Sequence, residues 1–269
     1  MPLAVCATPI GNLDDVTLRV LGELRAADLV LCEDTRRTRS LLGRHGIDVR
    51  LSSYHRHNEA ARTAQVLESL RAGMRVALVS DAGLPGVNDP GARLIAAAVE
   101  EGVELTVLPG ASAVETALVV SGLAADRYQF VGYLPRRSGE LRALAGELAS
   151  WAGAVVAFES PRRLPAALAV LAEELPGRRA AVCRELTKRF EEIVRGPLEE
   201  LAARFSEPPR GEITLVLAPA ADEREPGSDE DARAAVAELV DAGASRRTAA
   251  EVVSKLTGTP KNVLYRDSL

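Results

Sequence analysis

Short apolar runs are separated by segments of helical periodicity along the first half of the chain. The runs at residues 3–7, 29–32, 76–79 and 105–108 each end at a polar or Gly/Pro break, which predicts buried strands. Between them, apolar residues recur at helical spacing, as at Leu18, Leu21 and Leu24. A further helix is predicted over residues 111–121. Strands that alternate with helices in this way predict parallel βαβ units and an α/β fold.

The second half repeats this alternation and then departs from it. Strands are predicted at residues 129–132, 154–158 and 180–183, with helices around 141–148 and 164–175. The β-like segments 190–194 and 213–217 are separated only by a short helix at 198–205, which indicates a mixed sheet.

The end of the chain differs in composition from the rest. After Leu217 an acidic stretch poor in large apolar residues predicts a linker, and the remainder has the spacing of two short helices joined by a glycine turn, like a helix-turn-helix. This unit either packs on the main body or reads nucleic acid. We therefore expect an N-terminal α/β domain at 1–125, a second α/β domain at 126–219, a linker at 220–230 and a helical appendage at 231–269.

Composition is that of a soluble globular enzyme. Hydrophobic residues make up 47% and charged residues 26% of the 269 residues. Cys6, Cys32 and Cys183 are far apart and lie in apolar runs, so we expect buried, reduced thiols without a metal knuckle. The chain has no apolar run of membrane-spanning length and no secretory leader, so we expect a cytoplasmic protein with no membrane partner. The net charge of −5 argues against attraction of the whole surface to nucleic acid.

Four loops follow the predicted strand ends of the first half: TPIGN at 8–12, EDTR at 33–36, SDAGLPGVNDPG at 80–91 and PGASA at 109–113. Ligands of open α/β sheets bind at the carboxyl ends of the strands, so these loops should converge on one crevice. None contains the glycine pattern of a dinucleotide site or a P-loop. Taken singly, each such loop is more often a structural turn than a ligand site, because turns require these residue types in any case.

The loop SDAGLPGVNDPG contains two carboxylates. We assign Asp81 to a ligand. Asp89 is expected to cap the following helix, with Pro90 at its first position.

In combination these loops resemble a known family. The segments TPIGNLDD, EDTRRTRSLL, SYHRHNE, SDAGLPGVNDPG, PGASA, FESPRRL and CRELTKRFEE follow one another across nearly the whole chain. In that order they resemble the tetrapyrrole methylases, which use S-adenosylmethionine (SAM). Within that family the chain is similar to the branch that methylates a cytidine ribose 2′-hydroxyl in 16S ribosomal RNA of the bacterial small subunit.

The resemblance implies two α/β domains with SAM in the cleft between them, a small C-terminal helical unit, and a homodimer. The partner it implies is small-subunit ribosomal RNA, free or in the assembled subunit. The residues that it implies for the cofactor are Pro9, Ile10, Asp81, Ala82, Leu84, Ser112, Ala113, Phe158, Leu186, Glu212, Ile213 and Thr214. No metal is expected, because the three histidines lack an accompanying acidic cluster with metal spacing.

Methylation of a ribose hydroxyl requires a group that accepts its proton, and binding of RNA requires cationic side chains that contact its phosphates. We expect Glu185 and Lys188, and after them His55, to be catalytic; an ion pair between the first two and a capping or surface role for the histidine are the structural alternatives. The residues expected to contact RNA phosphates at the rim of the cleft are Arg36, Arg37, Arg39, Arg162 and Arg163. Candidates for stacking the target base are Tyr54, Tyr133 and Phe158, and each is also a natural core residue.

The sequence thus predicts a SAM-dependent methyltransferase of ribosomal RNA. Two alternatives stay open: a methylase of the same fold that acts on a small molecule of the tetrapyrrole type, and a non-catalytic binder of nucleic acid that senses SAM or a nucleotide.

Overall fold

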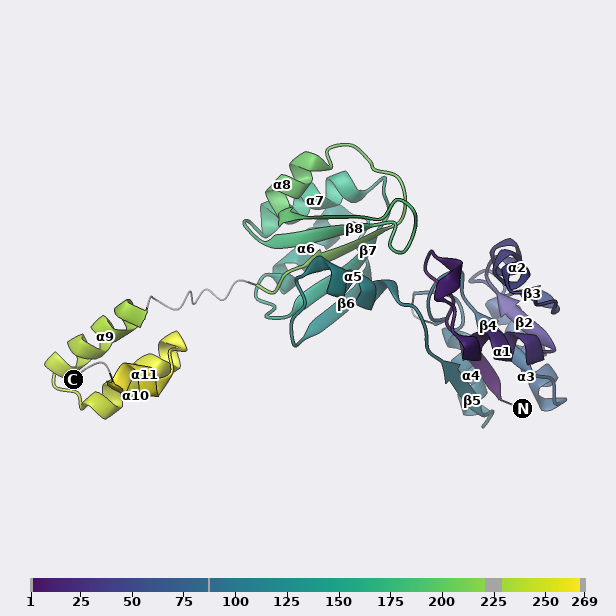
Figure 1. The fold of residues 1–269 in the computed structure, drawn as a ribbon, viewed down its shortest axis with the longest axis horizontal. Helices are drawn as coiled ribbons and strands as arrows, with labels where there is room; N and C mark the ends of the chain where they lie inside the picture. Colours follow the sequence, from purple (N-terminus) through teal and green to yellow (C-terminus); the bar gives the residue numbers. More distant parts are fainter. Residues whose placement is uncertain (1, 87, 221–228, 267–269) are drawn as a thin grey trace. The chain divides into compact units, whose positions relative to one another are not determined.

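A computed structural model describes residues 2–86, 88–220 and 229–266 of the chain (Figure 1). The chain divides into two compact units, Met1–Pro219 and Ala220–Leu269. The predicted linker lies largely outside the described residues. The first unit contains two sheets of five strands, each accompanied by helices, which confirms the predicted α/β class.

The first sheet is parallel throughout, as predicted. Its strands are β1 (Leu3–Cys6), β2 (Leu29–Cys32), β3 (Leu51–Ser53), β4 (Val76–Val79) and β5 (Leu105–Leu108), in the order β3-β2-β4-β1-β5. Side chains of α1 (Leu18–Ala26) and α2 (Thr35–Arg44) pack on one face, and those of α3 (Glu59–Arg71) and α4 (Ala92–Glu100) on the other. A short 3-10 helix, η1 (Leu13–Asp15), precedes α1. Burial on both faces explains why these strands are continuous apolar runs.

Two elements of this half, β3 and α2, were not predicted from the sequence. Strand β3 has one apolar residue, Leu51, followed by two serines, and it pairs only with β2 at the sheet edge. Helix α2 contains four arginines in ten residues, but Leu41 and Leu42 are buried. In both cases a few apolar side chains are enough to hold the element against the sheet. Because the remaining residues are polar, the apolar pattern that predicts a strand or helix is weak.

The second sheet is mixed, as predicted. Its strands are β6 (Tyr128–Tyr133), β7 (Ala154–Glu159), β8 (Arg179–Arg184), β9 (Glu192–Pro197) and β10 (Ile213–Leu217), in the order β6-β7-β10-β8-β9. Only β6 and β7 pair in parallel among the described pairs. Helices α6 (Ser138–Leu148), α7 (Leu164–Glu174) and α8 (Leu198–Arg204) cover one face (Figure 1).

The opposite face of the second sheet is covered by α5 (Ala113–Ser121). Val114, Ala117 and Leu118 of this helix pack against β7, β8 and β10. The helix follows a strand of the first sheet but contributes to the core of the second. The boundary expected between residues 125 and 126 stays a prediction.

Helix α4 does not begin where the sequence suggested. Its first residue is Ala92, and Gly91 is the N-cap residue with φ of 129°. Glycine is needed here both for this φ and because a Cβ would approach Leu78 Cδ2 to 2.9 Å. The assignment of Asp89 and Pro90 to the helix start is therefore wrong, and Asp89 is free to serve elsewhere.

The second unit is a bundle of three described helices rather than the two expected: α9 (Asp229–Asp241), α10 (Arg246–Thr257) and α11 (Lys261–Arg266). The Ser245 hydroxyl caps α10 by accepting from the Thr248 N–H. Val236, Val253 and Leu264 belong to a small core of its own. Within the described ranges, none of the helices is long and apolar enough to cross a membrane.

Candidate active site

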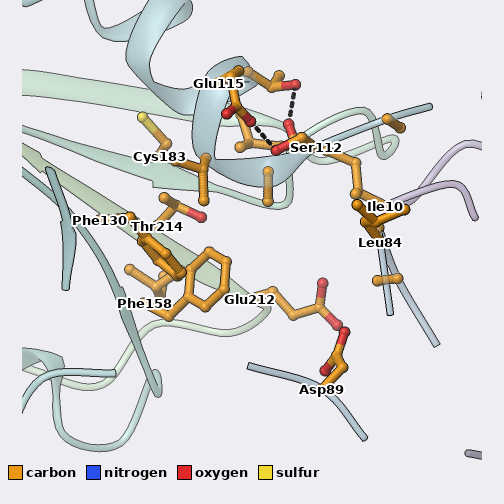
Figure 2. Close-up of a pocket in the computed structure, with 18 of the residues that line it drawn as sticks. Ile10, Leu84, Asp89, Ser112, Glu115, Phe130, Phe158, Cys183, Glu212 and Thr214 are labelled. Atoms are coloured by element: carbon orange, nitrogen blue, oxygen red, sulfur yellow. Dashed lines mark hydrogen bonds between the residues drawn. The ribbon is translucent and has the colours of Figure 1, made fainter. Parts of the chain in front are cut away.

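A cavity of about 1000 Å³ opens in the first unit and takes its wall from both sheets (Figure 2). The first half contributes the loops after β1, β4 and β5. The second half contributes side chains from β6, β7, β8 and β10 together with the start of α5. The predicted convergence of strand-end loops on one crevice is thus observed for three of the four loops, and Arg37 at the start of α2 adds a residue near the fourth.

The loops of the first half are tied together by backbone hydrogen bonds. Thr8 and Gly83 form an isolated antiparallel bridge, with N–H to O distances of 2.9 and 3.0 Å. The Thr8 hydroxyl also donates to Ser80 O at 3.0 Å. Gly83 has φ of 79°, a conformation that glycine adopts without strain. The two loops therefore present one continuous edge of backbone to the cavity.

The second half of the wall is the face of a sheet. Phe158, Thr214 and Cys183 lie in register on three neighbouring strands. The Phe158 ring lies edge-on to Phe130 at 4.9 Å and to Tyr133 at 5.6 Å between ring centroids. Burial raises the pKa of the Cys183 thiol to about 12, so this side chain acts as a small apolar group at neutral pH.

The start of α5 closes the cavity between the two walls. The Ser112 and Tyr128 hydroxyls both donate to the Glu115 carboxylate, and their hydrogen bonds lower its pKa in spite of partial burial (Figure 2). Ser112 makes no side-chain cap to its own helix, so the first N–H groups of α5 are not satisfied by it.

The predicted cofactor residues gather at this cavity. Those that line it are Ile10, Asp81, Ala82, Leu84, Ser112, Ala113, Phe158, Leu186, Glu212, Ile213 and Thr214. Pro9 lies on an adjoining cavity of about 270 Å³, which shares Ile10, Asp81 and Glu212 with the larger one. Their ligand contacts stay a prediction.

The loop between β8 and β9 contains two of the residues predicted to be catalytic. Glu185 and Thr187 have φ of 53° and 64°, which is rare for side chains with a Cβ and marks stored strain. Gly211 accommodates Glu185, because a Cβ there would lie 2.4 Å from Glu185 Cγ. The Asn12 N–H donates to Thr187 Oγ1 at 3.0 Å, which ties this loop to the loop after β1.

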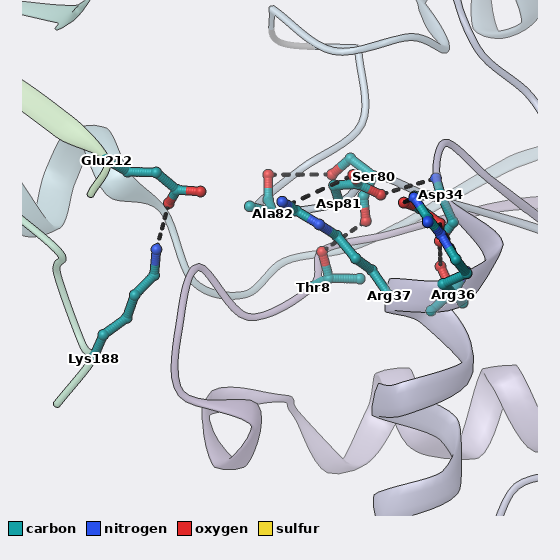
Figure 3. Close-up of polar contacts among 10 residues, drawn as sticks. Thr8, Asp34, Arg36, Arg37, Ser80, Asp81, Ala82, Lys188 and Glu212 are labelled. Carbon is teal, nitrogen blue, oxygen red and sulfur yellow. Dashed lines mark hydrogen bonds and ion pairs between the residues drawn. The ribbon is translucent and has the colours of Figure 1, made fainter. Parts of the chain in front are cut away.

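Lys188 joins two carboxylates. Its Nζ lies 2.9 Å from Glu185 Oε1. It also lies 2.8 Å from Glu212 Oε2 (Figure 3). Burial alone would lower the pKa of the amine, but the hydrogen bonds and charges of Glu212 and Glu185 outweigh it and the pKa is raised. The hydrogen bond from the Glu212 N–H, opposed by desolvation and aided by Lys188, lowers the pKa of Glu185. Lys188 lines the smaller cavity, and neither residue lines the larger one.

His55 lies in the loop after β3 and lines neither cavity. Its N–H donates to Asn58 Oδ1 at 2.8 Å, and its buried Nδ1 is without a partner among the described residues. Tyr54 is only 1% exposed and shares a hydrogen bond with Thr63, so it is a core residue and not a stacking platform.

The predicted RNA-contacting arginines occupy different settings. Arg36 pairs with Asp34 at 2.7 Å, and Arg37 lies 3.7 Å from Asp81 while lining both cavities (Figure 3). Arg39 and Arg162 are exposed. Arg163 instead pairs at 2.5 Å with the Glu159 carboxylate, which is 1% exposed.

Asp89 is a cavity residue that sequence reasoning assigned to the fold. Burial, followed by the charges of Glu33 and Asp81, raises the pKa of Asp89 to about 6, against a smaller opposing effect of the charge of Arg56. The signal was present in the sequence as a second carboxylate in a ligand loop. The assignment of Asp89 to a helix cap led us to overlook it as a cavity residue.

Across the part of the chain that the structure describes, no cluster of metal-ligating side chains occurs.

The fold and cavity are those of a SAM-dependent methylase class. A family model described as Tetrapyrrole (Corrin/Porphyrin) Methylases matches residues 2–202, and the chain therefore belongs to this family. Solved structures share the fold. They include the methyltransferase CobJ, with a TM-score of 0.64 at 22% identity over 82% of this chain and 95% of that one. Another is the uroporphyrin-III C-methyltransferase of Thermus thermophilus in complex with S-adenyl homocysteine, with a TM-score of 0.58 at 19% identity over 81% of this chain and 97% of that one.

Relatives of higher identity define a branch within the family. The protein named Ribosomal RNA small subunit methyltransferase I in Micromonospora olivasterospora is 47% identical to this chain, over 98% of this chain and 85% of the relative. The protein of that name in Mycobacterium tuberculosis is 44% identical, over 98% of this chain and 93% of the relative. The chain is a member of the branch that these proteins form.

Proposed function

We propose that this protein transfers the methyl group of SAM to 16S ribosomal RNA of the small subunit, at the 2′-hydroxyl of a cytidine ribose. The larger cavity carries this proposal, because eleven of the twelve residues implied for the cofactor by sequence resemblance line it. The names of the relatives support an RNA substrate. The ribose hydroxyl as the acceptor group rests on the sequence resemblance alone.

The residues of the cavity suit SAM. Its volume of about 1000 Å³ lies at the upper end of the range for small-molecule sites, which leaves room for a nucleotide beside the donor. Phe130, Phe158 and Leu186 offer apolar surface for an adenine ring, while the Asp81 carboxylate offers a partner for a cationic group. When bound, SAM supplies an electrophilic methyl group on a sulfonium, so the protein has mainly to align donor and acceptor.

The other predicted residues fit this function to different degrees. Arg36, Arg37, Arg39 and Arg162 are exposed cations suited to RNA phosphates near the cavity or on the surface of the same unit. The contacts of Arg163 support a structural role instead. Those of Glu185 and Lys188 support positioning of the loops, since both are engaged in ion pairs. A catalytic role for Glu185, Lys188 or His55 stays a prediction, as do the homodimer and the cytoplasmic location.

The test uses SAM with a labelled methyl group. Incubated with small subunits or 16S RNA from cells that lack the modification, the protein should incorporate label that appears as 2′-O-methylcytidine after digestion to nucleosides. Comparison of free RNA with assembled subunits identifies the substrate form. Binding of SAM without incorporation into either form would disprove the proposed function. Incorporation into a base would refute the ribose assignment alone.

A further inference from the structure

Five carboxylates line the larger cavity, and four are already engaged. Asp81 accepts the Asp34 N–H at 3.0 Å and faces Arg37. Glu212 pairs with Lys188, Glu159 pairs with Arg163, and Glu115 accepts two hydroxyl donors. Each of these four carboxylates therefore already has a hydrogen-bond donor or a cation as its partner, whereas a general base must have an oxygen within hydrogen-bond reach of the substrate proton.

Asp89 is the exception among these five. It forms no ion pair within the described parts of the chain, and its side chain is drawn in the cavity in Figure 2. It lies between β4 and α4, and Gly86 and Gly91 on either side of it have φ of 86° and 129°. Arg56 reinforces this loop by donating to Asn88 O at 2.5 Å. Asp89 is therefore a cavity carboxylate that has no ion-pair partner among the described residues.

The remaining titratable groups of the larger cavity are unsuited to accept a proton at neutral pH. Burial raises the pKa of the Cys183 thiol to about 12, and it also raises the pKa of Tyr133, aided by Glu212, Asp89 and Glu159. The hydrogen bond to Glu115 raises the pKa of Tyr128. Arg37 is a cation throughout. Among the described lining residues there is no histidine and no lysine.

We infer that Asp89 is the catalytic residue that accepts the proton of the attacking hydroxyl. The inference rests on the proposed function. As the ribose oxygen forms its bond to the methyl carbon, the carbon–sulfur bond of the donor breaks and leaves its electron pair on sulfur. The hydroxyl proton passes to a carboxylate oxygen of Asp89 and from there to solvent. This assignment competes with the earlier prediction of Glu185, Lys188 or His55, none of which lines the larger cavity.

The surroundings of Asp89 match this task. Glu33 and Asp81 add negative charge, and Arg56 adds positive charge. Burial and the two neighbouring carboxylates dominate, so the pKa of Asp89 is raised to about 6. A general base works best with a pKa near the operating pH, where it is ionised and still basic. Glu33 also has a raised pKa, through burial and the charge of Asp81, but it lines neither cavity.

The first experiment compares the wild type with Asp89→Asn in single-turnover methyl transfer to the RNA substrate. We expect the rate constant to fall by about a hundredfold or more, with SAM and RNA affinities within about twofold of the wild type. Asp48→Asn, a neutralised carboxyl at an exposed position outside both cavities, is the matched control and should keep the full rate. A rate within about threefold of the wild type in Asp89→Asn would overturn the assignment.

The second experiment does not depend on the folding or activity of that variant. Carbon NMR of the side-chain carboxyls should show Asp89 titrating with a midpoint of about 6 in the ligand-free protein. Glu33→Gln removes a neighbouring negative charge, so it should lower this midpoint by on the order of half a unit. The acid limb of the pH–rate profile should move with it, while the rate at pH 8 stays unchanged. A limb that does not follow the Asp89 midpoint would refute the role of Asp89 as the base.

The two proposals fail in different ways. A wild-type protein that binds SAM but methylates no RNA would refute the proposed function, and the assignment of the base would fall with it. An active wild type whose Asp89→Asn variant is equally active would refute the assignment alone. Parallel measurement of Glu185→Gln would then show whether the base lies in the β8–β9 loop.

Discussion

The two walls of the larger cavity are built in opposite ways. In the first half, loops that leave a parallel sheet supply Asp81, Asp89 and much exposed backbone. In the second half, the face of a mixed sheet supplies Phe158 and Cys183 in one row across paired strands. The loop wall thus exposes backbone and two aspartates to the cavity, whereas the middle of the sheet face exposes mainly apolar side chains, with Glu159 at the end of β7.

This difference separates two tasks. A sheet face is fixed by strand pairing and by α5 packed on it, so it offers a rigid apolar surface that suits the unreactive part of a ligand. Loops at strand ends are free of such packing and can differ between proteins that share the fold. We therefore expect substitutions in the sheet wall to change stability and SAM binding, and substitution of Asp89 in the loop wall to change the reaction.

The largest effect should come from Arg163→Ala. This change leaves the Glu159 carboxylate, 1% exposed, without its cation. We expect the free energy of unfolding to fall by about 3 kcal/mol in denaturant titration. The neighbouring Arg162→Ala removes an exposed cation and should change stability by less than about 0.5 kcal/mol. Equal stability of the two variants would contradict the structural role of Arg163.

Gly11→Ala tests the contact between the two walls. A Cβ at this position would lie 2.6 Å from Lys188 Cγ and from Thr187 Oγ1, and 2.7 Å from Leu186 O. Because a backbone oxygen cannot rotate away, we expect a loss of about 2 kcal/mol in the free energy of unfolding. Gly22→Ala is the control, since a Cβ there meets no atom within 4 Å and alanine favours helix α1. Thermal unfolding should show the first variant lowered and the second unchanged or raised.

Phe158→Ala should weaken SAM binding more than RNA binding. The ring packs on Phe130 and Tyr133 and forms part of the sheet wall. Loss of about 2 kcal/mol of apolar and aromatic contact corresponds to about a thirtyfold rise in the SAM dissociation constant by calorimetry. Phe190→Ala serves as the control, because Phe190 is exposed and lines neither cavity. If RNA affinity fell instead, the division of tasks between the walls would be wrong.

The smallest effect is expected for Arg36→Ala. Arg36 is exposed and lines neither cavity, whereas Arg37 lines both, so Arg36 alone isolates RNA binding from SAM binding. Removing one phosphate contact should lower the slope of log affinity against log salt by about 0.7 to 0.9. SAM affinity should not change. An unaltered slope would exclude Arg36 from the RNA contacts.

The sequence predicted the loop wall better than the sheet wall. In parallel units all carboxyl ends meet at one edge, so Asp81 and Ser112 were placed together from spacing and resemblance. The sheet wall depends on which strands pair. Phe158 and Thr214 were reached only by resemblance. Phe130, Tyr133 and Cys183 were not predicted as cofactor residues. Their position on the cavity follows from the strand order β6-β7-β10-β8-β9, in which β10 lies between β7 and β8 although it follows both in the chain.

The wrong helix-cap assignment of Asp89 and the unexpected ion pair of Arg163 have a common physical cause. Asp89 precedes Pro90 and a helix, which is the usual setting of an N-cap, but two further residues of loop move the helix start to Ala92. Arg163 follows Arg162 in an exposed-looking motif, yet its neighbour one helical turn back, Glu159, ends a buried strand. The local sequence pattern indicates which residue types suit a turn or a helix start. The contacts and burial that a residue acquires in the folded protein determine its role.

The packing of helix α5 affects which crossover points between homologous genes would yield a well-packed protein. Its strand neighbour β5 belongs to the first sheet, while its own side chains fill the core under β7, β8 and β10. A crossover between two homologous genes that falls after α5 would combine this helix from one parent with the opposing sheet from the other, and mismatched side chains would meet in that core. A crossover between β5 and α5 would keep this helix with the sheet on which it packs, and only a few loop residues such as Ile10 would come from the other parent.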